Sequence, residues 1–301
     1  MEVTATASYK SPTGEPRTSH CQFTLPLGLV ARVVPGAGEA RCKLTLDTDK
    51  EPVHIPTLYQ DMAESLRLPD GSLPAANLLS FAYTSGEEVK IIASKNAGRY
   101  RIQSTSLGAM CHVAGDLTRR LEAYFAAKGG QCCFSFSESI PLPEYLECVE
   151  RHHALRKDMA VRRDRLADRA QQYRSVQKRL LVRYKERNPA PVGHLDLLLQ
   201  GTYDELLDLG TAYEEQQAML KRVSGELSCA TRLVLRLMAY KFQLDEENVK
   251  VLTSHWTADV DDNLEQGWEE RVNSALLHLL RSTMAKAKEN RPEPEPTLNQ
   301  P

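Results

Sequence analysis

The stretch PEYLECVERHHALRKDMAVRRDRLADRAQQYRSVQKRLLVRYKER, residues 143–187, sets the architecture of this chain. After Pro143 it contains neither glycine nor proline, and it is rich in Leu, Arg, Ala, Gln and Glu, which favour helices. Proline is tolerated at a helix entry, and Asn188-Pro189 ends the pattern because a residue before proline leaves the α region. At 1.5 Å per residue the predicted helix is about 65 Å long. A helix of this length projects from a small domain or needs a partner helix.

The apolar residues of this helix form a narrow stripe. Met159, Leu166, Tyr173 and Leu180 recur every seven residues, and Ala170 and Tyr184 fall four after Leu166 and Leu180. This spacing is typical of a coiled-coil seam. The remaining surface is basic: between residues 151 and 187, thirteen Lys and Arg less four Asp and Glu leave nine positive charges, whereas the whole chain carries −2.

The rest of the carboxy-terminal half also predicts helices. Residues 194–200 form a short helix closed by Gly201, and Thr202 with Glu205 resembles a capping box that starts a second long helix reaching about Phe242. Two long helices joined by a proline-rich turn make an αα-hairpin. Further helices are expected from Asp245 and over 268–284, followed by a solvated tail from residue 289.

The amino-terminal half mixes strands and helices. Alternating apolar residues predict strands over 2–9, 21–29, 40–47, 77–83, 88–94, 100–104 and 131–137. Helical spacing predicts helices over 55–66 and 107–127, the second ended by Gly129-Gly130. The fold class is therefore α+β, a sheet covered by helices and followed by a helical hairpin. A strand this close to the first residue predicts that the sequence begins partway through a β-domain.

Composition narrows the class of protein. The seven cysteines are scattered, odd in number and without CxxC spacing, which fits reduced thiols in a reducing compartment. No apolar leader stands at the amino terminus, and no uncharged apolar run approaches the length of a membrane span. We recognise no catalytic set and no phosphate-binding glycine motif, so we predict no catalytic, cofactor or metal site and no enzyme. Cys148 and His152 are spaced as two metal ligands, but two ligands alone do not close a site.

The basic helix is compatible with several classes of binding partner. We favour acidic protein surfaces, contacted by Arg162, Arg163, Arg169 and Arg179, over anionic lipid. Nucleic acid is not expected, because stacking aromatics are few and residues 245–270 supply nine acidic side chains of the chain's own. Trp256 and Trp268 flank this acidic segment and either anchor a partner or fill a local core. An apolar seam left without a partner helix would let the chain pair with a second copy.

Several segments resemble one known family. RYRIQS (99–104), SIPLPEY (139–145), RLLVRYK (179–185), PAP (189–191) and residues 194–203 are similar to the carboxy-terminal third of the family of Bardet–Biedl syndrome protein nine, also called parathyroid-hormone-responsive B1 protein. The similarity spans nearly the whole chain and is weakest over residues 60–80 and in the tail. The amino-terminal β-propeller of that family has no counterpart here, so its functions are not carried over.

The resemblance implies a role and a layout. It implies a non-enzymatic subunit of the BBSome, a coat-like adaptor that moves membrane proteins into and out of cilia, with other BBSome subunits as partners and a membrane reached through the assembled complex. The expected location is the cytoplasm, the cilium with its membrane, and the basal body region. The layout implied is the last strands of an ear-like β-sandwich (1–25), an α+β platform (26–141), a long αα-hairpin (142–243), carboxy-terminal helices (244–288) and a disordered tail (289–301).

Overall fold

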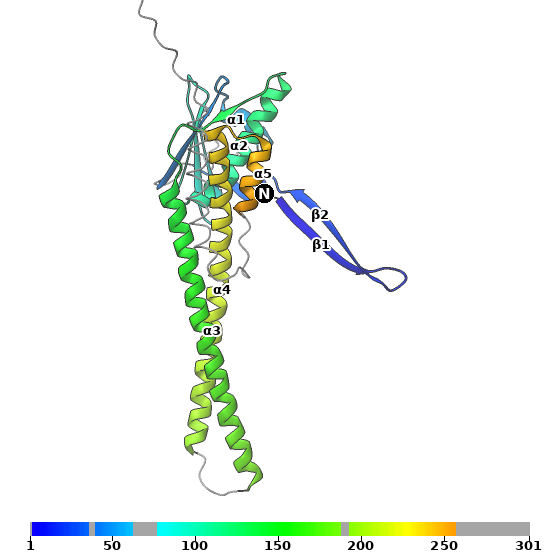
Figure 1. Ribbon diagram of the computed structural model, residues 1–301, viewed down its shortest axis with the longest axis vertical. Coiled ribbons are helices and arrows are strands. Elements are labelled where there is room, and N and C mark those ends of the chain that lie inside the picture. Colours follow the sequence, from blue (N-terminus) through cyan, green and yellow to red (C-terminus); the bar gives the residue numbers. More distant parts are fainter. Residues whose placement is uncertain (1, 36–39, 63–76, 188–192, 257–301) are drawn as a thin grey trace, which may run out of the picture. The chain divides into compact units, whose positions relative to one another are not determined.

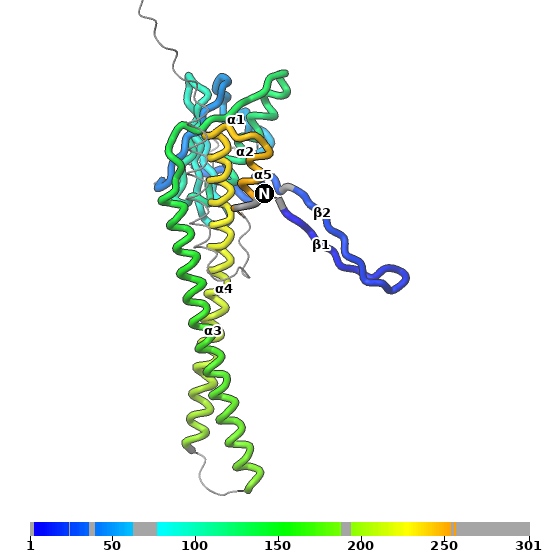
Figure 2. The backbone as a smooth tube through the Cα atoms, in the orientation of Figure 1, coloured from blue at the N-terminus to red at the C-terminus, as the bar shows by residue number. Residues whose placement is uncertain are grey.

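The computed structural model of the chain describes residues 2–35, 40–62, 77–187 and 193–256 (Figure 1; Figure 2). These residues divide into two compact units. The platform unit comprises the described residues up to 145 together with 228–256, and the hairpin unit comprises the described residues between 146 and 227. The predicted α+β class is confirmed by the strands and helices that follow.

The platform unit is built on a six-stranded antiparallel sheet in the order β3-β5-β6-β7-β4-β8. Its strands are β3 (Ala31–Val33), β4 (Cys42–Thr48), β5 (Leu78–Tyr83), β6 (Glu88–Ala93), β7 (Arg99–Ser104) and β8 (Phe134–Ser135). The strands predicted over 77–104 match β5, β6 and β7 within one residue at each end. The strand predicted over 131–137 is reduced to β8, because only Phe134 and Ser135 pair with β4.

The sheet buries a continuous apolar row. Leu79 lies opposite Ile91, Ile91 opposite Ile102, and Ile102 opposite Leu44, so one row crosses four strands. All four side chains are at most 1% exposed. Such cross-strand pairs are the main stabilising contacts of a sheet. The alternation that predicted these strands is therefore the alternation between the core and the outer face.

Helices of the platform unit cover this core. Helix α2 (Leu107–Ala127) lies against β6 and β7, and the hydroxyl of Tyr83 donates to the carbonyl of Ala109 at 2.9 Å. Gly129 follows with φ +78°, which confirms the predicted helix stop. The helix predicted over 55–66 is instead a single turn, α1 (Ile55–Leu58), followed by the 3₁₀ turn η2 (Gln60–Met62); residues 63–66 lie outside the described residues.

Strands β1 (Glu2–Lys10) and β2 (Pro16–Thr24) form a separate two-stranded antiparallel ribbon. The prediction of a strand over 21–29 was wrong in its bounds: β2 begins at Pro16, because the Ser11–Glu15 loop folds it directly back onto β1. The 3₁₀ turn η1 (Leu27–Leu29) occupies the end of the predicted strand. Side chains from Thr4 to Lys10 and from Pro16 to Phe23 are exposed.

Three more helices follow in the described part of the chain: α3 (Leu142–Lys185), α4 (Gly193–Phe242) and α5 (Glu246–His255). The predicted start of a helix at Asp245 is confirmed, since its carboxylate accepts a hydrogen bond from the amide of Asn248 at 3.0 Å. The predicted break at Gly201 was wrong. Thr202 does not cap a new helix; its hydroxyl donates to the carbonyls of Leu198 and Leu199, one turn earlier in the same helix.

Replacing Gly201 with alanine is expected to raise the free energy of unfolding by about 0.5–1 kcal/mol, because glycine costs this much within a helix. No atom lies within 4 Å of the position that the added Cβ would take. Gly129→Ala is the matched control: its φ of +78° strains any other residue, so we expect a loss of about 1 kcal/mol. Chemical unfolding measures both values. A destabilising Gly201→Ala variant would mean that the helix breaks at this position.

Candidate partner-binding face of the helical hairpin

The two helices of the hairpin unit pack through a heptad seam. In α4 the buried and half-buried side chains recur at alternating steps of four and three: Leu195, Leu199, Thr202, Leu206, Leu209, Tyr213, Gln216, Leu220, Val223 and Leu227. In α3 the seam repeats every seven residues: His152, Met159, Leu166, Tyr173 and Leu180. This is the spacing of coiled-coil packing. Val176, 6% exposed, belongs to the seam, whereas Tyr184, 83% exposed, does not, contrary to its predicted place.

Contacts across the seam set the register of the hairpin. The ring nitrogen Nε2 of His152 lies 3.0 Å from the hydroxyl of Ser224, and the rings of Tyr173 and Tyr203 lie 5.9 Å apart. His152 is 1% exposed. The imidazole that sequence spacing offered as a metal ligand with Cys148 is therefore hydrogen-bonded inside the seam. Over the described part of the chain, no group of three or more His, Cys, Asp or Glu side chains is arranged to hold a metal ion.

The helices of the hairpin unit carry opposite charge. Between residues 146 and 187, thirteen Lys and Arg less six Asp and Glu leave seven positive charges. Between residues 193 and 227, seven Asp and Glu against two Lys and Arg leave five negative charges. The counter-charge that we expected from residues 245–270 is thus already present on α4. Sequence reasoning missed it because the acids of α4 are dispersed along the helix rather than gathered in one block.

Ion pairs between described side chains join the basic helix to the acidic one. Arg169 Nε lies 2.9 Å from Glu205 Oε1, and Arg169 also donates to the side chain of Gln172 at 2.7 Å. Arg151 pairs with Glu226. Glu205 and Glu226 are three heptads apart and so lie on the same side of α4. Both arginines therefore lie on one flank of α3.

This flank collects further arginines, and we call it the arginine face. Arg165 and Arg179 are two and four heptads from Arg151, and Arg162 is one heptad from Arg169. The arginine face consists of Arg151, Arg162, Arg165, Arg169 and Arg179. Arg162, Arg165 and Arg179 are exposed. Within the described ranges, no hydrogen bond or ion pair joins these three to another side chain.

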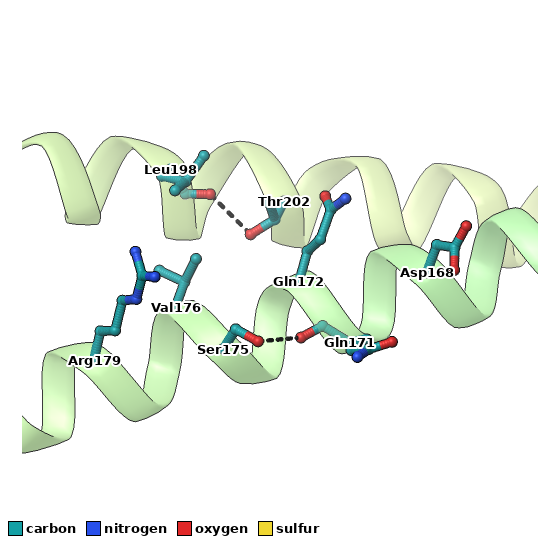
Figure 3. Close-up of a pocket in the computed structure, with 8 residues that line it drawn as sticks. All are labelled: Asp168, Gln171, Gln172, Ser175, Val176, Arg179, Leu198 and Thr202. Carbon is teal, nitrogen blue, oxygen red and sulfur yellow. Dashed lines mark hydrogen bonds between the residues drawn. The ribbon is translucent and has the colours of Figure 1, made fainter.

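A groove between α3 and α4 lies on the arginine face (Figure 3). It encloses about 450 Å³ and is lined by Asp168, Gln171, Gln172, Ser175, Val176, Arg179, Leu198 and Thr202. Figure 3 shows Arg179 and Asp168 at opposite ends, and the hydroxyls of Ser175 and Thr202 bonded to carbonyls of their own helices. Val176 and the half-exposed Leu198 provide apolar contact area between these charges. The groove therefore suits an amphipathic segment better than a small polar molecule.

The structure separates the four arginines that the sequence nominated. Arg162, Arg169 and Arg179 lie on the arginine face. Arg163 falls on the opposite flank of the seam, one heptad before Ala170, where it lies 3.6 Å from Asp164. Arg169 already pairs with Glu205, so a contact from Arg169 to a partner must compete with that acid. The partner contacts themselves stay predictions.

Three family models match consecutive parts of the chain. The PTHB1 platform domain matches residues 26–139, the PTHB1 hairpin residues 139–242, and the PTHB1 C-terminal helix bundle residues 244–301. The chain belongs to the PTHB1 family.

Curated PTHB1 proteins agree with this. The chain is 36% identical to Protein PTHB1 of Homo sapiens over 294 residues, 95% of this chain and 32% of the relative. Identity to Protein PTHB1 of Xenopus laevis is also 36%, over 95% of this chain and 34% of that protein. A pthb1 homolog of Caenorhabditis elegans is 23% identical over 89% of the chain and 34% of its own length. The chain thus spans about a third of the PTHB1 relatives that it matches.

Of the two tryptophans in this PTHB1-family chain, Trp256 lies in a described core and Trp268 lies outside the described residues. Trp256 is 2% exposed, and its indole N–H donates to the hydroxyl of Tyr145 at 3.0 Å. The two rings meet edge to face at 5.4 Å. Trp256 therefore fills a local core of the platform unit, which corrects its nomination as a partner anchor. Trp268, the helix predicted over 268–284 and the predicted tail lie outside the described residues.

Sequence reasoning missed four charged residues beside the seam of the PTHB1 hairpin. Arg151, Arg165, Glu205 and Glu226 were not nominated, although a heptad count started from either seam would have placed them beside it. The described helices include none that is long and apolar enough to cross a membrane.

Proposed function

We propose that the chain is the carboxy-terminal part of a scaffold subunit of the BBSome, the coat-like adaptor complex for ciliary membrane proteins. Its arginine face binds acidic helical surfaces of neighbouring subunits. The protein acts without catalysis, in the cytoplasm and at the cilium, its membrane and the basal body region. Membership of the PTHB1 family supports this proposal, since its models describe platform, hairpin and helix-bundle modules.

The observation that carries the proposal is the set of three exposed arginines beside a partly apolar groove. A guanidinium offers a planar fork of N–H donors that matches a carboxylate in bidentate fashion. Leu198 and Val161, 50% and 47% exposed, stand on the same flank and provide apolar contact area. Complementary charge directs encounter and register, while apolar burial slows dissociation. An acidic amphipathic helix satisfies both requirements.

A specific feature favours a second candidate, an anionic membrane surface. Leu181 and Tyr184 are 59% and 83% exposed near the end of α3, and Arg183 and Lys185 lie beside them. Apolar side chains among cations are typical of segments that lie on acidic bilayers. This region differs from the arginine face, so the two candidates are separable by substitution.

Charge reversal on the arginine face tests the proposal. We expect Arg162→Glu, Arg165→Glu and Arg179→Glu together to reduce co-purification with BBSome subunits by about tenfold or more, which corresponds to about 1.4 kcal/mol. The matched control reverses Arg163, Arg174 and Lys178, which carry the same charge change away from the face. Its co-purification is expected to stay within about twofold, and both variants should unfold within about 0.5 kcal/mol of the parent.

Two outcomes would contradict this function. Equal losses in the two triple variants would mean that net charge matters and the face does not. Flotation of the chain with phosphatidylserine vesicles at physiological salt, lost on replacing Leu181 and Tyr184 with serine, would favour the membrane candidate. Unchanged co-purification by the face variant would reject the arginine face.

A further inference from the structure

The flank of the hairpin opposite the arginine face is partly apolar, and we call it the alanine flank. Its residues recur at the same spacing on both helices: Arg163, Ala167, Ala170 and Arg174 on α3, and Tyr203, Leu207, Gly210 and Glu214 on α4. Leu207 is 52% exposed and Tyr203 is 43% exposed. A Cβ added to Gly210 would meet no atom within 4 Å. The hairpin unit thus leaves apolar side chains and open space on this flank.

The two helices bring opposite charge to the alanine flank. Arg163 and Arg174 are exposed on α3, and Glu214 is exposed on α4. Arg163 lies 3.6 Å from Asp164, but the two side chains are 69% and 75% exposed, and such a pair contributes little. Glu214 has no ion-pair partner among the described side chains, whereas the acids of α4 beside the arginine face are paired within the hairpin. A cationic column therefore runs beside an unpaired acid.

Contacts across the seam fix which residues of the two helices lie level with each other. The ring of Tyr173 lies beside that of Tyr203, at 5.9 Å. The helices are antiparallel, so ten residues back along α3 correspond to ten residues on along α4. Arg163 is therefore level with Glu214 to within one residue. The same count places Leu207 at the level of residue 169 of α3.

We propose that the alanine flank binds the same flank of a second copy of this chain, so that two hairpins pointing the same way form a four-helix bundle. A two-fold axis along the hairpin sets each α3 against the partner's α4 at the same level. Arg163 then meets the partner's Glu214, and this contact occurs twice. The partner's Leu207 falls between Ala167 and Ala170, whose small side chains leave room for it.

This pairing uses a surface separate from the arginine face, so it is tested independently of the proposed function. Sedimentation equilibrium of the full chain between about 1 and 200 µM is expected to show a mass that rises from 33.8 kDa toward twice that value. Reversal of three arginine-face charges, Arg162→Glu with Arg165→Glu and Arg179→Glu, should leave this dimerisation unchanged. A parent chain that stays monomeric over the whole range would overturn the proposal.

Exchanging the facing charges tests the arrangement. Arg163→Glu alone and Glu214→Arg alone each place like charges at both contacts, so each should weaken dimerisation by about tenfold or more. An equimolar mixture of these two variants should dimerise like the parent, because both contacts of a mixed pair then join opposite charges. A mixture no better than either variant by itself would reject the two-fold arrangement.

The apolar part of the flank has its own variants. Leu207→Ser and Gly210→Gln should each weaken dimerisation by about tenfold or more, and Gly210→Gln should still fold because its Cβ has open space and glycine disfavours helices. Leu197→Ser is the matched control, since Leu197 is 75% exposed on α4 outside the flank, and it should dimerise like the parent. Equal losses in Leu197→Ser and Leu207→Ser would contradict the proposal. So would a monomeric parent whose co-purification with BBSome subunits is lost in Leu207→Ser, because the flank would then belong to another subunit.

Discussion

Replacing Trp256 with alanine is expected to lower the free energy of unfolding of the platform unit by about 3–5 kcal/mol. The indole is 2% exposed, so its removal opens a cavity in addition to losing transfer free energy. It also leaves the Tyr145 hydroxyl without the indole N–H, and that hydroxyl lies 3.2 Å from Thr231 in the same buried cluster. The residue therefore joins α5 to the first turn of α3 and the last part of α4.

Two other variants separate the parts of this effect. Trp256→Phe keeps most of the ring volume and loses the N–H donor, so we expect it to lower the free energy of unfolding by roughly 1–2 kcal/mol. Lys250 is exposed on α5, so the free energy of unfolding of Lys250→Ala should stay within about 0.5 kcal/mol of the parent value. Hydrogen exchange of amides in β6 and β7 measures the platform unit apart from the hairpin. A Trp256→Ala loss below about 1 kcal/mol would show that the indole is not part of this core.

Arg120→Ala is expected to cost about 3 kcal/mol, because it breaks a partly buried network around one guanidinium. Arg120 donates to Asp61 through a two-pronged contact of 2.5 and 2.8 Å, to Asp116 at 2.5 Å and to the carbonyl of Leu58 at 2.7 Å. Its guanidinium carbon lies 4.4 Å from the centre of the buried Tyr59 ring. Without it, the 8%-exposed Asp116 keeps, among the described side chains, only the ion pair with the neighbouring Arg119.

Arg119→Ala is the control for Arg120→Ala, because Arg119 contacts the same Asp116 from a side chain that is 60% exposed. We expect Arg119→Ala to lower the free energy of unfolding by less than about 1 kcal/mol, which is the usual contribution of an exposed ion pair. Arg120→Lys keeps the charge and loses the fork, and it should fall between the two. Urea unfolding of the three variants orders them. Equal losses for Arg119→Ala and Arg120→Ala would contradict a network centred on Arg120.

The same network gives a pH dependence. The hydrogen bond from Arg120 lowers the pKa of Asp61 below its ordinary value of 3.8. A carboxyl whose pKa is lower in the folded state stabilises the fold above its unfolded pKa and loses that contribution as the pH falls through the folded value. The stability difference between the parent and Arg120→Ala should therefore shrink below about pH 4.

Local sequence patterns predicted the helices and strands, and they failed where packing against a distant segment decides the structure. The alternation over residues 77–104 and the helical spacing over 107–127 are local, and both gave accurate bounds. Gly201 and Thr202 have the composition of a break, but the hairpin buries Thr202 in a seam that continues through them. The cost of one glycine in a helix is about 1 kcal/mol, and tertiary packing along the whole helix outweighs it.

The arginine face was predicted only in part, because its position also depends on packing against a distant segment. A charge count identified the basic helix, but it could not distinguish Arg162 from the adjacent Arg163, which the seam places on opposite flanks. The distinction needs the partner helix, because only Glu205 and Glu226 show which flank of α3 is which.

The ion pairs Arg151–Glu226 and Arg169–Glu205 constrain how the length of the hairpin can vary among related chains. Arg151 and Arg169 are 18 residues apart, and their acids are 21 apart, so both matches depend on a fixed residue count. One residue inserted between the arginines would turn one of them by about 100° away from its acid. Viable insertions or deletions should therefore come as compensated two-turn blocks, one in each helix.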